Sequence, residues 1–239
     1  MKRSAILGAM TIPANLQTIQ ARIAAASGRA QRNSAEMRLV AVTKTIAVEP
    51  INAALAAGIT DIGENRVQEA EGKFAQLNSP VCHHLIGHLQ SNKVRLAVEL
   101  FDWIHSVDSI KLAEKLNHWA GILGRRLVVL AQVDLGKEPT KEGVEVEFLP
   151  PLADYLANCT QLDFRGLMTV PPYFDDVNLT RPYFAQLRAL KEQLNNHLAK
   201  PLTELSMGMS HDFEVAIEEG ATIIRVGTAL FGVRPPKND

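Results

Sequence analysis

The chain has 239 residues, 46% of them hydrophobic and 21% charged, which is an ordinary mixture for a globular protein. Its 25 basic and 26 acidic side chains give a net charge of −1, which leaves no basic field for a nucleic acid. The two cysteines, Cys82 and Cys159, cannot form a disulfide framework, and no run of about 18 apolar residues predicts a membrane span. We therefore expect a cytoplasmic protein that binds neither nucleic acid nor a membrane.

Short β-rich runs alternate with amphipathic helical stretches along the chain. A first helix is expected from Pro13 to about Ala30, because Leu16, Ile19 and Ile23 recur at helical spacing. Eight strands are then expected, at Leu39–Lys44, Thr60–Gly63, His83–Gly87, Trp103–Ser106, Leu127–Asp134, Phe164–Thr169, Glu204–Met207 and Thr222–Gly227. Helices between them are expected at Pro50–Ala57, at Ser91–Leu100 and Ser109–Ala120 with serine N-caps, at Thr180–Leu198, and after a capping Ser210 as far as Gly220.

Strands that alternate with helices pair in parallel through crossover connections. Val40–Val42 and Leu127–Val133 are almost continuous apolar runs, as expected of strands buried on both faces. Eight such units predict an α/β fold, a single (β/α)8 TIM-type barrel with an extra N-terminal helix; a doubly wound open sheet is the alternative. We expect residues 1–12 to be an N-terminal extension that can be disordered, and residues 13–239 to form the one domain.

Three polar positions lie where this fold places active sites, at the carboxyl ends of the strands. Lys44 ends the first expected strand, and a neutral lysine amine forms Schiff bases with aldehydes; on position alone, a strand-end lysine more often extends into solvent. Gly227 and Thr228 follow the last strand, where backbone N–H groups at the start of a short helix can bind a phosphate. A glycine needed only for the turn explains this pair equally well.

Arg225 is unusual because it lies inside an apolar strand, two residues before Gly227. It either points into the barrel, where it needs an acceptor, or faces a helix and pairs there. Arginine does not readily give up a proton, so beside a pyridine ring it would donate a hydrogen bond to an unprotonated ring nitrogen. A neutral ring is a weaker electron sink than a pyridinium, and carbanion chemistry would be disfavoured.

The remaining polar groups do not predict catalysis or a metal site. Cys82 and His84 share one side of a strand, but closed zinc sites usually need four ligands at better spacings. Asp134 is expected to cap a loop, and nothing pairs Glu64 with Glu69 as acid and base. We therefore predict no catalytic residue and no metal ligand.

Five segments in order along the chain are similar to one known family. They are Val40–Lys44, Ile62–Glu69, His84–Lys93, Gly166–Pro171 and Leu205–Glu214, the last continuing through Ile224–Gly232. With these segments the chain resembles the pyridoxal phosphate homeostasis proteins, a barrel family related to the N-terminal domain of alanine racemase. The segments span most of the sequence, and together they are far more specific than any one of them.

The resemblance implies a cofactor, pyridoxal 5′-phosphate (PLP), which is a form of vitamin B6, and a role for each matching residue. Lys44 would form the internal aldimine, and Arg225 would face the pyridine nitrogen. The phosphate would be held by three residues, Ser206, Gly227 and Thr228. Asn65 and Met168 would lie near the ring or its lysine. Lys141 falls at a family lysine after the fifth strand, where it would affect a secondary cofactor route.

The resemblance also implies a function without catalysis. The family lacks an established activity, so we expect buffering and delivery of PLP within the cell, with effects on amino-acid and keto-acid balance. PLP-requiring apo-enzymes are the expected recipients, and a monomer is expected because the β-rich second domain of alanine racemase is missing. A PLP enzyme such as an amino-acid racemase is the alternative, and Tyr173 is the one tyrosine expected to reach the barrel mouth. A regulatory or scaffold protein that senses PLP is a third possibility.

Overall fold

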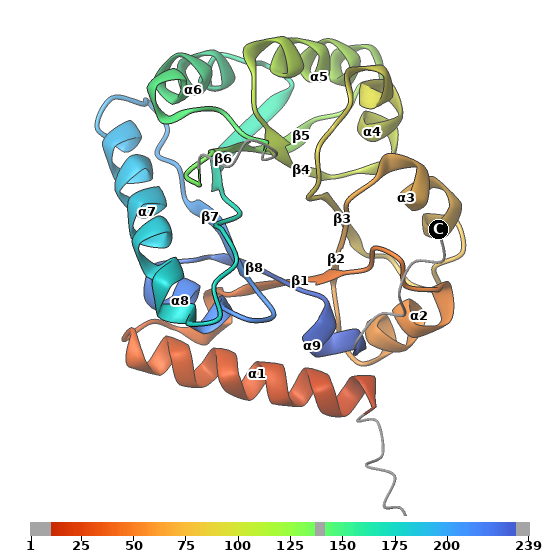
Figure 1. Cartoon of the computed structure of the whole chain (residues 1–239). Coiled ribbons are helices and arrows are strands. Elements are labelled where there is room, and N and C mark those ends of the chain that lie inside the picture. Colours follow the sequence, from red (N-terminus) through yellow and green to blue (C-terminus); the bar gives the residue numbers. More distant parts are fainter. Residues whose placement is uncertain (1–10, 137–141, 233–239) are drawn as a thin grey trace, which may run out of the picture.

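Eight parallel strands close into a barrel that is surrounded by helices (Figure 1). The structure, a computed structural model, describes residues 11–136 and 142–232. The strands are β1 (Arg38–Val42), β2 (Asp61–Glu64), β3 (Cys82–Leu85), β4 (Trp103–Val107), β5 (Leu127–Gln132), β6 (Leu162–Met168), β7 (Glu204–Met209) and β8 (Ile223–Val226). Each pairs with the next in parallel, and β1 pairs with β8 to close the barrel.

The helices occupy the crossovers, and α1 lies outside the barrel against α8 and α9 (Figure 1). They are α1 (Ile12–Arg29), α2 (Val48–Ala56), α3 (Val67–Phe74), α4 (Val94–Leu100), α5 (Ile110–Ile122), α6 (Leu149–Ala157), α7 (Arg181–Asn195), α8 (Phe213–Glu218) and α9 (Thr228–Phe231). The main apolar core lies between the barrel and this ring. A smaller cluster fills the inside of the barrel, formed by Val40, Trp103, Leu130, Met168 and Ile223.

The prediction of a single (β/α)8 barrel is confirmed, and all eight strands lie within a few residues of their expected positions. The serine cap at Ser109 is also confirmed, because its side chain accepts a hydrogen bond from the Leu112 amide. The cap at Ser91 is wrong: a 3-10 turn, Ser91–Lys93, precedes α4 there. The cap at Ser210 is wrong as well, because Asp212 precedes α8 and Ser210 contacts the start of α9 instead.

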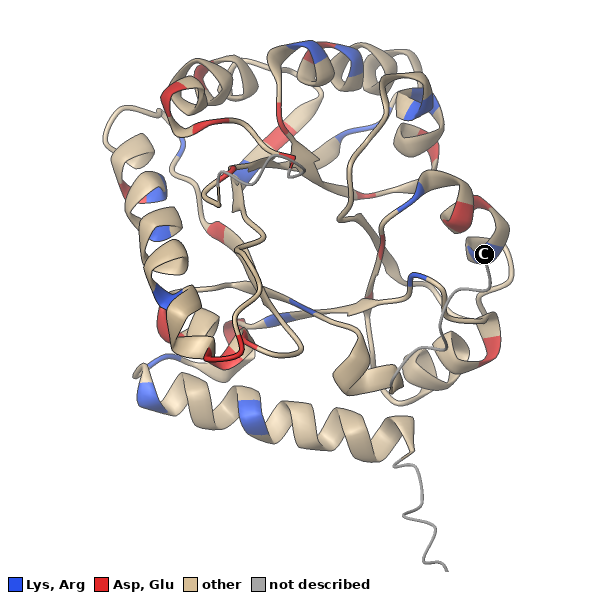
Figure 2. Ribbon diagram, in the orientation of Figure 1, with Lys and Arg blue, Asp and Glu red and all other residues tan. Residues whose placement is uncertain are grey.

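Two predictions lie partly or wholly outside the described residues. These are the N-terminal extension, apart from Thr11 and Ile12 at the start of α1, and the role of Lys141. Within the described residues, no helix is both long and apolar enough to cross a membrane. Figure 2 shows positive and negative positions spread around the ring of helices, without a face of one sign in this view.

Candidate functional site

A cavity of about 300 Å³ opens at the carboxyl ends of the strands. Its volume is at the lower end of the range of small-molecule sites. Its lining comes from the ends of β1, β2, β3, β6, β7 and β8, and consists of Val42, Lys44, Asn65, Ile86, Val170, Met209, Ser210, His211, Arg225, Gly227 and Thr228. Five of the seven predicted cofactor residues therefore lie around one space. A larger cavity of about 720 Å³ lies at the opposite end of the barrel, away from these residues.

The backbone on both sides of Lys44 is held from the outside of the barrel. Thr43 donates its hydroxyl to Glu64, and its carbonyl accepts from Nζ of Lys73 at 2.7 Å. The amide of Thr45 donates to Glu69, and Thr45 has a φ of 60°, a left-handed conformation that is uncommon for threonine. These contacts fix where the chain leaves β1, and so where the Lys44 side chain begins.

Lys73 joins two acidic residues that the sequence did not pair. Its Nζ lies 2.9 Å from Oε1 of Glu64 and 2.6 Å from Oε1 of Glu69. Glu64 is fully buried, and its Oε2 has no hydrogen-bond partner in the described part of the chain. Burial raises the pKa of Glu64, while Lys73 and Thr43 partly oppose that rise. Lys73 therefore opposes the neutralisation of Glu64 that burial favours.

We expect Lys73→Met to destabilise the fold by about 3–5 kcal/mol at neutral pH, because it leaves a buried carboxylate uncompensated. The folded-state pKa of Glu64 already lies above its unfolded value, and the substitution raises it further. The stability contributed by the protonated form is complete below the ordinary carboxyl pKa and is lost as the pH rises through the folded pKa. Urea unfolding should therefore show a larger deficit at pH 8 than at pH 5.

The matched control for Lys73→Met is the double variant Glu64→Gln/Lys73→Met. It removes the buried charge, so most of the pH dependence of the deficit should disappear. An equal deficit at both pH values in the single variant would contradict the assignment of Lys73 as the partner of Glu64.

Asn65 is held at the cavity by a close approach of two loops. A Cβ atom at Gly87 would lie 2.5 Å from the carbonyl oxygen of Asn65 and 2.9 Å from its Cα. Only glycine therefore fits at this position without moving the Asn65 backbone. The hydroxyl of Ser106 donates to the Gly87 carbonyl at 2.7 Å, which fixes this loop against β4.

The turn after β8 lines the cavity at Gly227 and Thr228 and is joined there to Ser210. Gly227 precedes α9, and the Oγ of Ser210 accepts hydrogen bonds from the amides of Gly227 and Ala229, at 3.1 and 3.2 Å. One hydroxyl and the first turn of a short helix thus converge beside Thr228, an arrangement suited to an anion. Ser210 itself lines the cavity, a placement that the sequence analysis did not predict.

Arg225 points into the barrel, which settles the alternative left open by the sequence. It is 3% exposed, and it donates from Nη1 to the Ser206 hydroxyl at 2.6 Å and from Nη2 to the Thr169 carbonyl at 2.8 Å. Burial lowers the pKa of Arg225 to about 10, and the charge of Asp212 opposes this. The guanidinium is therefore cationic at neutral pH and fixed at two points.

Two predicted residues do not line the cavity. Met168 is fully buried in the apolar cluster inside the barrel, and Ser206 is fully buried beneath Arg225. Tyr173 is 74% exposed and stacks on His211, with the ring centroids 5.3 Å apart. Because His211 lines the cavity, Tyr173 lies near its rim. His211 and Ser210 could have been predicted as site residues from the sequence, because both belong to the Leu205–Glu214 segment.

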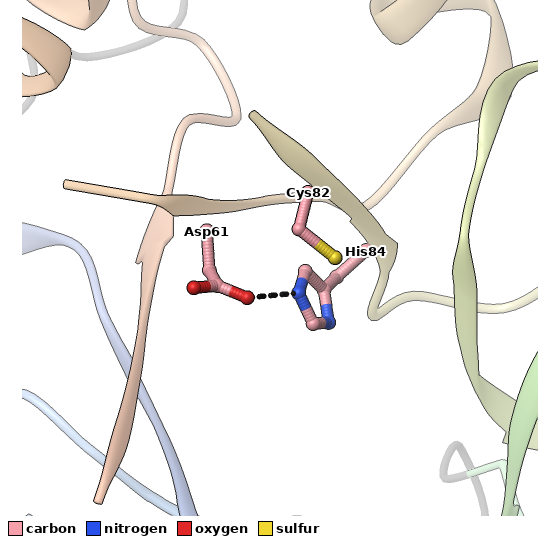
Figure 3. Close-up of side chains that lie close together, drawn as sticks. All are labelled: Asp61, Cys82 and His84. Atoms are coloured by element: carbon pink, nitrogen blue, oxygen red, sulfur yellow. Dashed lines mark hydrogen bonds and ion pairs between the residues drawn. The ribbon is translucent and has the colours of Figure 1, made fainter. Parts of the chain in front are cut away.

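One cluster of potential metal ligands lies among the described residues, at the other end of the barrel. Atoms of Asp61, Cys82 and His84 lie within 4.8 Å of one another (Figure 3). Oδ1 of Asp61 is shared by Nη1 of Arg38 at 2.5 Å and Nε2 of His84 at 2.9 Å. Burial, followed by the charges of Asp61 and Asp102, raises the pKa of Cys82 to about 12, so it is a thiol rather than a thiolate ligand. These groups are organised as a hydrogen-bonded set.

The fold and the cavity define a class of barrel, and sequence comparison agrees. Residues 14–235 match the alanine racemase N-terminal domain family. The chain is 42% identical over 229 residues to the pyridoxal phosphate homeostasis protein of Pasteurella multocida, covering 94% of this chain and 98% of the relative. It is 43% identical over 225 residues to that of Pseudomonas aeruginosa, covering 94% and 96%. The chain therefore belongs to the pyridoxal phosphate homeostasis protein family.

A solved relative shows the same barrel. PipY of Synechococcus elongatus PCC7942, in a structure with PLP bound, is 44% identical with a TM-score of 0.79, covering 90% of this chain and all of that one. The resemblance inferred from the five sequence segments is thus confirmed at the level of the family.

Proposed function

We propose that this chain binds PLP covalently through Lys44 and serves in PLP homeostasis, by buffering and delivering the cofactor. The observation that carries the proposal is that Lys44, Arg225 and the Gly227–Thr228 turn line one cavity of about 300 Å³. Related proteins of Pasteurella multocida and Pseudomonas aeruginosa bear this functional name, and PipY has been solved with PLP bound.

Each part of PLP has a complementary group in the cavity. The aldehyde would supply the carbonyl carbon that the Lys44 amine attacks, with the loss of one water. The phosphate would lie at Gly227 and Thr228, with Ser210 in the place first given to Ser206, because Ser210 lines the cavity and Ser206 does not. Arg225 would face the ring nitrogen, and Asn65 would lie beside the lysine. Met168 would support the ring site only from within the barrel core.

The lining supports a carrier more than an enzyme. Its titratable side chains among the described residues are Lys44, His211 and Arg225, without a carboxylate. A racemase needs two groups that exchange a proton on opposite faces of the substrate. Arg225 cannot readily protonate the ring, so the electron sink would be weak. Cytoplasmic location, a monomeric state and PLP-requiring apo-enzymes as recipients are parts of the same proposal.

The proposal is tested by measuring the transfer of PLP from this chain to an apo-enzyme. The PLP-loaded chain should show an absorbance band of the bound cofactor, and it should activate an added PLP-requiring apo-enzyme as the band falls. The α-protons of a panel of amino acids should exchange with deuterium no faster than with free PLP. Fast exchange with any amino acid would favour the racemase instead. A chain that takes up no PLP at all would contradict the function outright.

A further inference from the structure

A row of buried polar side chains crosses the inside of the barrel and ends at the candidate PLP cavity. It runs from Asp61 on β2 through His84 on β3 and His105 on β4 to Ser206 on β7 and Arg225 on β8. The successive atoms are 2.9, 2.9, 2.9 and 2.6 Å apart, and none of the five residues is more than 5% exposed. β4 and β7 are not neighbours in the barrel, so the contact between His105 and Ser206 spans the lumen.

The two ends of the row fix its direction. Arg225 can only donate, and an ionised Asp61 can only accept. The Nε2–H of His84 therefore donates to Asp61, which leaves Nδ1 of His84 to accept from Nε2–H of His105. Nδ1 of His105 must then accept the hydroxyl proton of Ser206, and Ser206 accepts from Nη1 of Arg225. Every hydrogen bond in the row is therefore donated in the direction from Arg225 to Asp61, and both imidazoles are neutral.

The opposite direction would leave a buried hydrogen-bond donor without an acceptor. If His105 donated from Nδ1, Ser206 would accept from His105 and from Arg225 at once. Its own hydroxyl proton would then need another acceptor in the barrel interior, where an unmade hydrogen bond costs about 1–3 kcal/mol. The forward direction satisfies each of these atoms, and hydrogen bonds in such a row polarise one another.

The surroundings favour neutral imidazoles and an ionised carboxylate. Burial lowers the pKa of His84, with Asp61 opposing, and burial lowers that of His105 well below its usual range. Burial alone would raise the pKa of Asp61, but hydrogen bonds from His84, Thr60 and Arg38 outweigh it and hold that pKa below the usual carboxyl range. Trp103, which belongs to the apolar cluster inside the barrel, stacks on His84 with the ring centroids 5.4 Å apart.

We propose that Asp61, at the far end of the barrel from the cofactor cavity, is a positioning residue for Arg225, acting through His84, His105 and Ser206. Its negative charge selects the tautomers, so that the Ser206 hydroxyl is committed to His105 and presents a lone pair to Arg225. The Ser206 and Thr169 contacts then fix the guanidinium plane at the cavity. The consequence for bound PLP rests on the function proposed above; the direction of the row does not.

The direction is tested without the cofactor. In the unliganded wild-type chain, ¹⁵N NMR of the imidazoles, assigned by loss of each signal in His84→Gln and His105→Gln, should show both rings neutral at pH 7, with the proton on Nε2. In Asp61→Asn, the amide oxygen can still accept from Arg38 and His84, but the negative charge that favours the Nε2–H form is lost, so a fraction of the Nδ1–H form should appear in both rings. An Nδ1–H tautomer or an imidazolium at either position in the wild type would overturn the proposal.

The effect on the cofactor is tested with a matched control. Asp163 lies at the same end of the barrel, on β6, is 9% exposed and pairs with Arg165 and Lys200, but it is outside the row. In the PLP-loaded chain, Asp61→Asn should move the midpoint of the pH titration of the bound-cofactor absorbance upward by about half a unit or more, because a loosened Arg225 no longer opposes protonation of the ring nitrogen. Asp163→Asn should leave it unchanged.

The titratable groups near Arg225 are Lys44 and His211 in the cavity lining and the buried Asp212, and both variants retain them. Equal shifts in the two variants, or none in Asp61→Asn, would overturn the positioning role. If the wild-type chain takes up no PLP, the proposed function fails, while the NMR measurement still decides the direction of the row.

Discussion

Lys44→Ala should remove the absorbance band of the covalently bound cofactor completely, while leaving the fold intact. Lys44 is the lysine among the described lining residues, and the substitution shortens its side chain to a methyl group that cannot form a Schiff base. Lys44→Arg should give the same spectrum, because a guanidinium keeps the charge but is not a nucleophile at neutral pH. The measurement is a difference spectrum after addition of PLP, with circular dichroism as the check on folding.

Lys93→Ala is the matched control. Lys93 lines an adjoining cavity of about 590 Å³ that shares Asn65 with the candidate site. It is therefore a lysine at the same end of the barrel without access to the same space. Retention of the band in Lys44→Ala, or its loss in Lys93→Ala, would show that the wrong amine has been assigned.

Gly166→Ala should destabilise the fold strongly. A Cβ atom at Gly166 would lie 1.9 Å from the carbonyl oxygen of Glu204, its partner in the β6–β7 ladder, and 2.6 Å from the carbonyl carbon. Backbone cannot move out of the way as a flexible side chain can, so β6 and β7 must separate. We expect a loss of about 3 kcal/mol in the free energy of unfolding, measured by urea denaturation.

Gly121→Ala provides the comparison for Gly166→Ala. Gly121 lies in α5, and a Cβ there would meet only Cγ of Gln161 at 3.7 Å, an ordinary contact. Because alanine is a better helix former than glycine, this variant should be neutral or more stable by up to about 1 kcal/mol. A loss in Gly166→Ala no larger than the change in Gly121→Ala would mean that the strands can accommodate the added methyl group.

Periodicity predicted the barrel because buried strands and amphipathic helices leave strong local patterns. Val40–Val42 is apolar throughout and Leu127–Val133 is interrupted only by Gln132, and the barrel buries almost all of these residues. Helix starts were less predictable, because a serine can cap the helix that follows it or form hydrogen bonds with a distant part of the chain. Ser109 caps α5, whereas Ser210 accepts from amides at the start of α9, which is remote from it in sequence.

Residues of the candidate site could be predicted where a charged side chain occupies a position that is usually apolar or buried. Lys44 at a strand end and Arg225 inside an apolar strand are of this kind, and both line the cavity. Ser206 and Ser210 could not be distinguished by sequence, because both lie in one segment and only the structure shows that Ser206 is buried beneath Arg225 while Ser210 lines the cavity. Lys73 and Asp61 were missed because each has a buried partner on another element, Glu64 of β2 for Lys73 and His84 of β3 for Asp61.

The central claim is that the Lys44 amine and the Gly227–Thr228 turn hold one PLP molecule between them. Reduction of the PLP-loaded wild-type chain with borohydride would make the link permanent, and peptide mapping by mass spectrometry would locate it. We expect a single pyridoxyl label, on the peptide that contains Lys44. A label on any other lysine, or no label at all, would contradict the account.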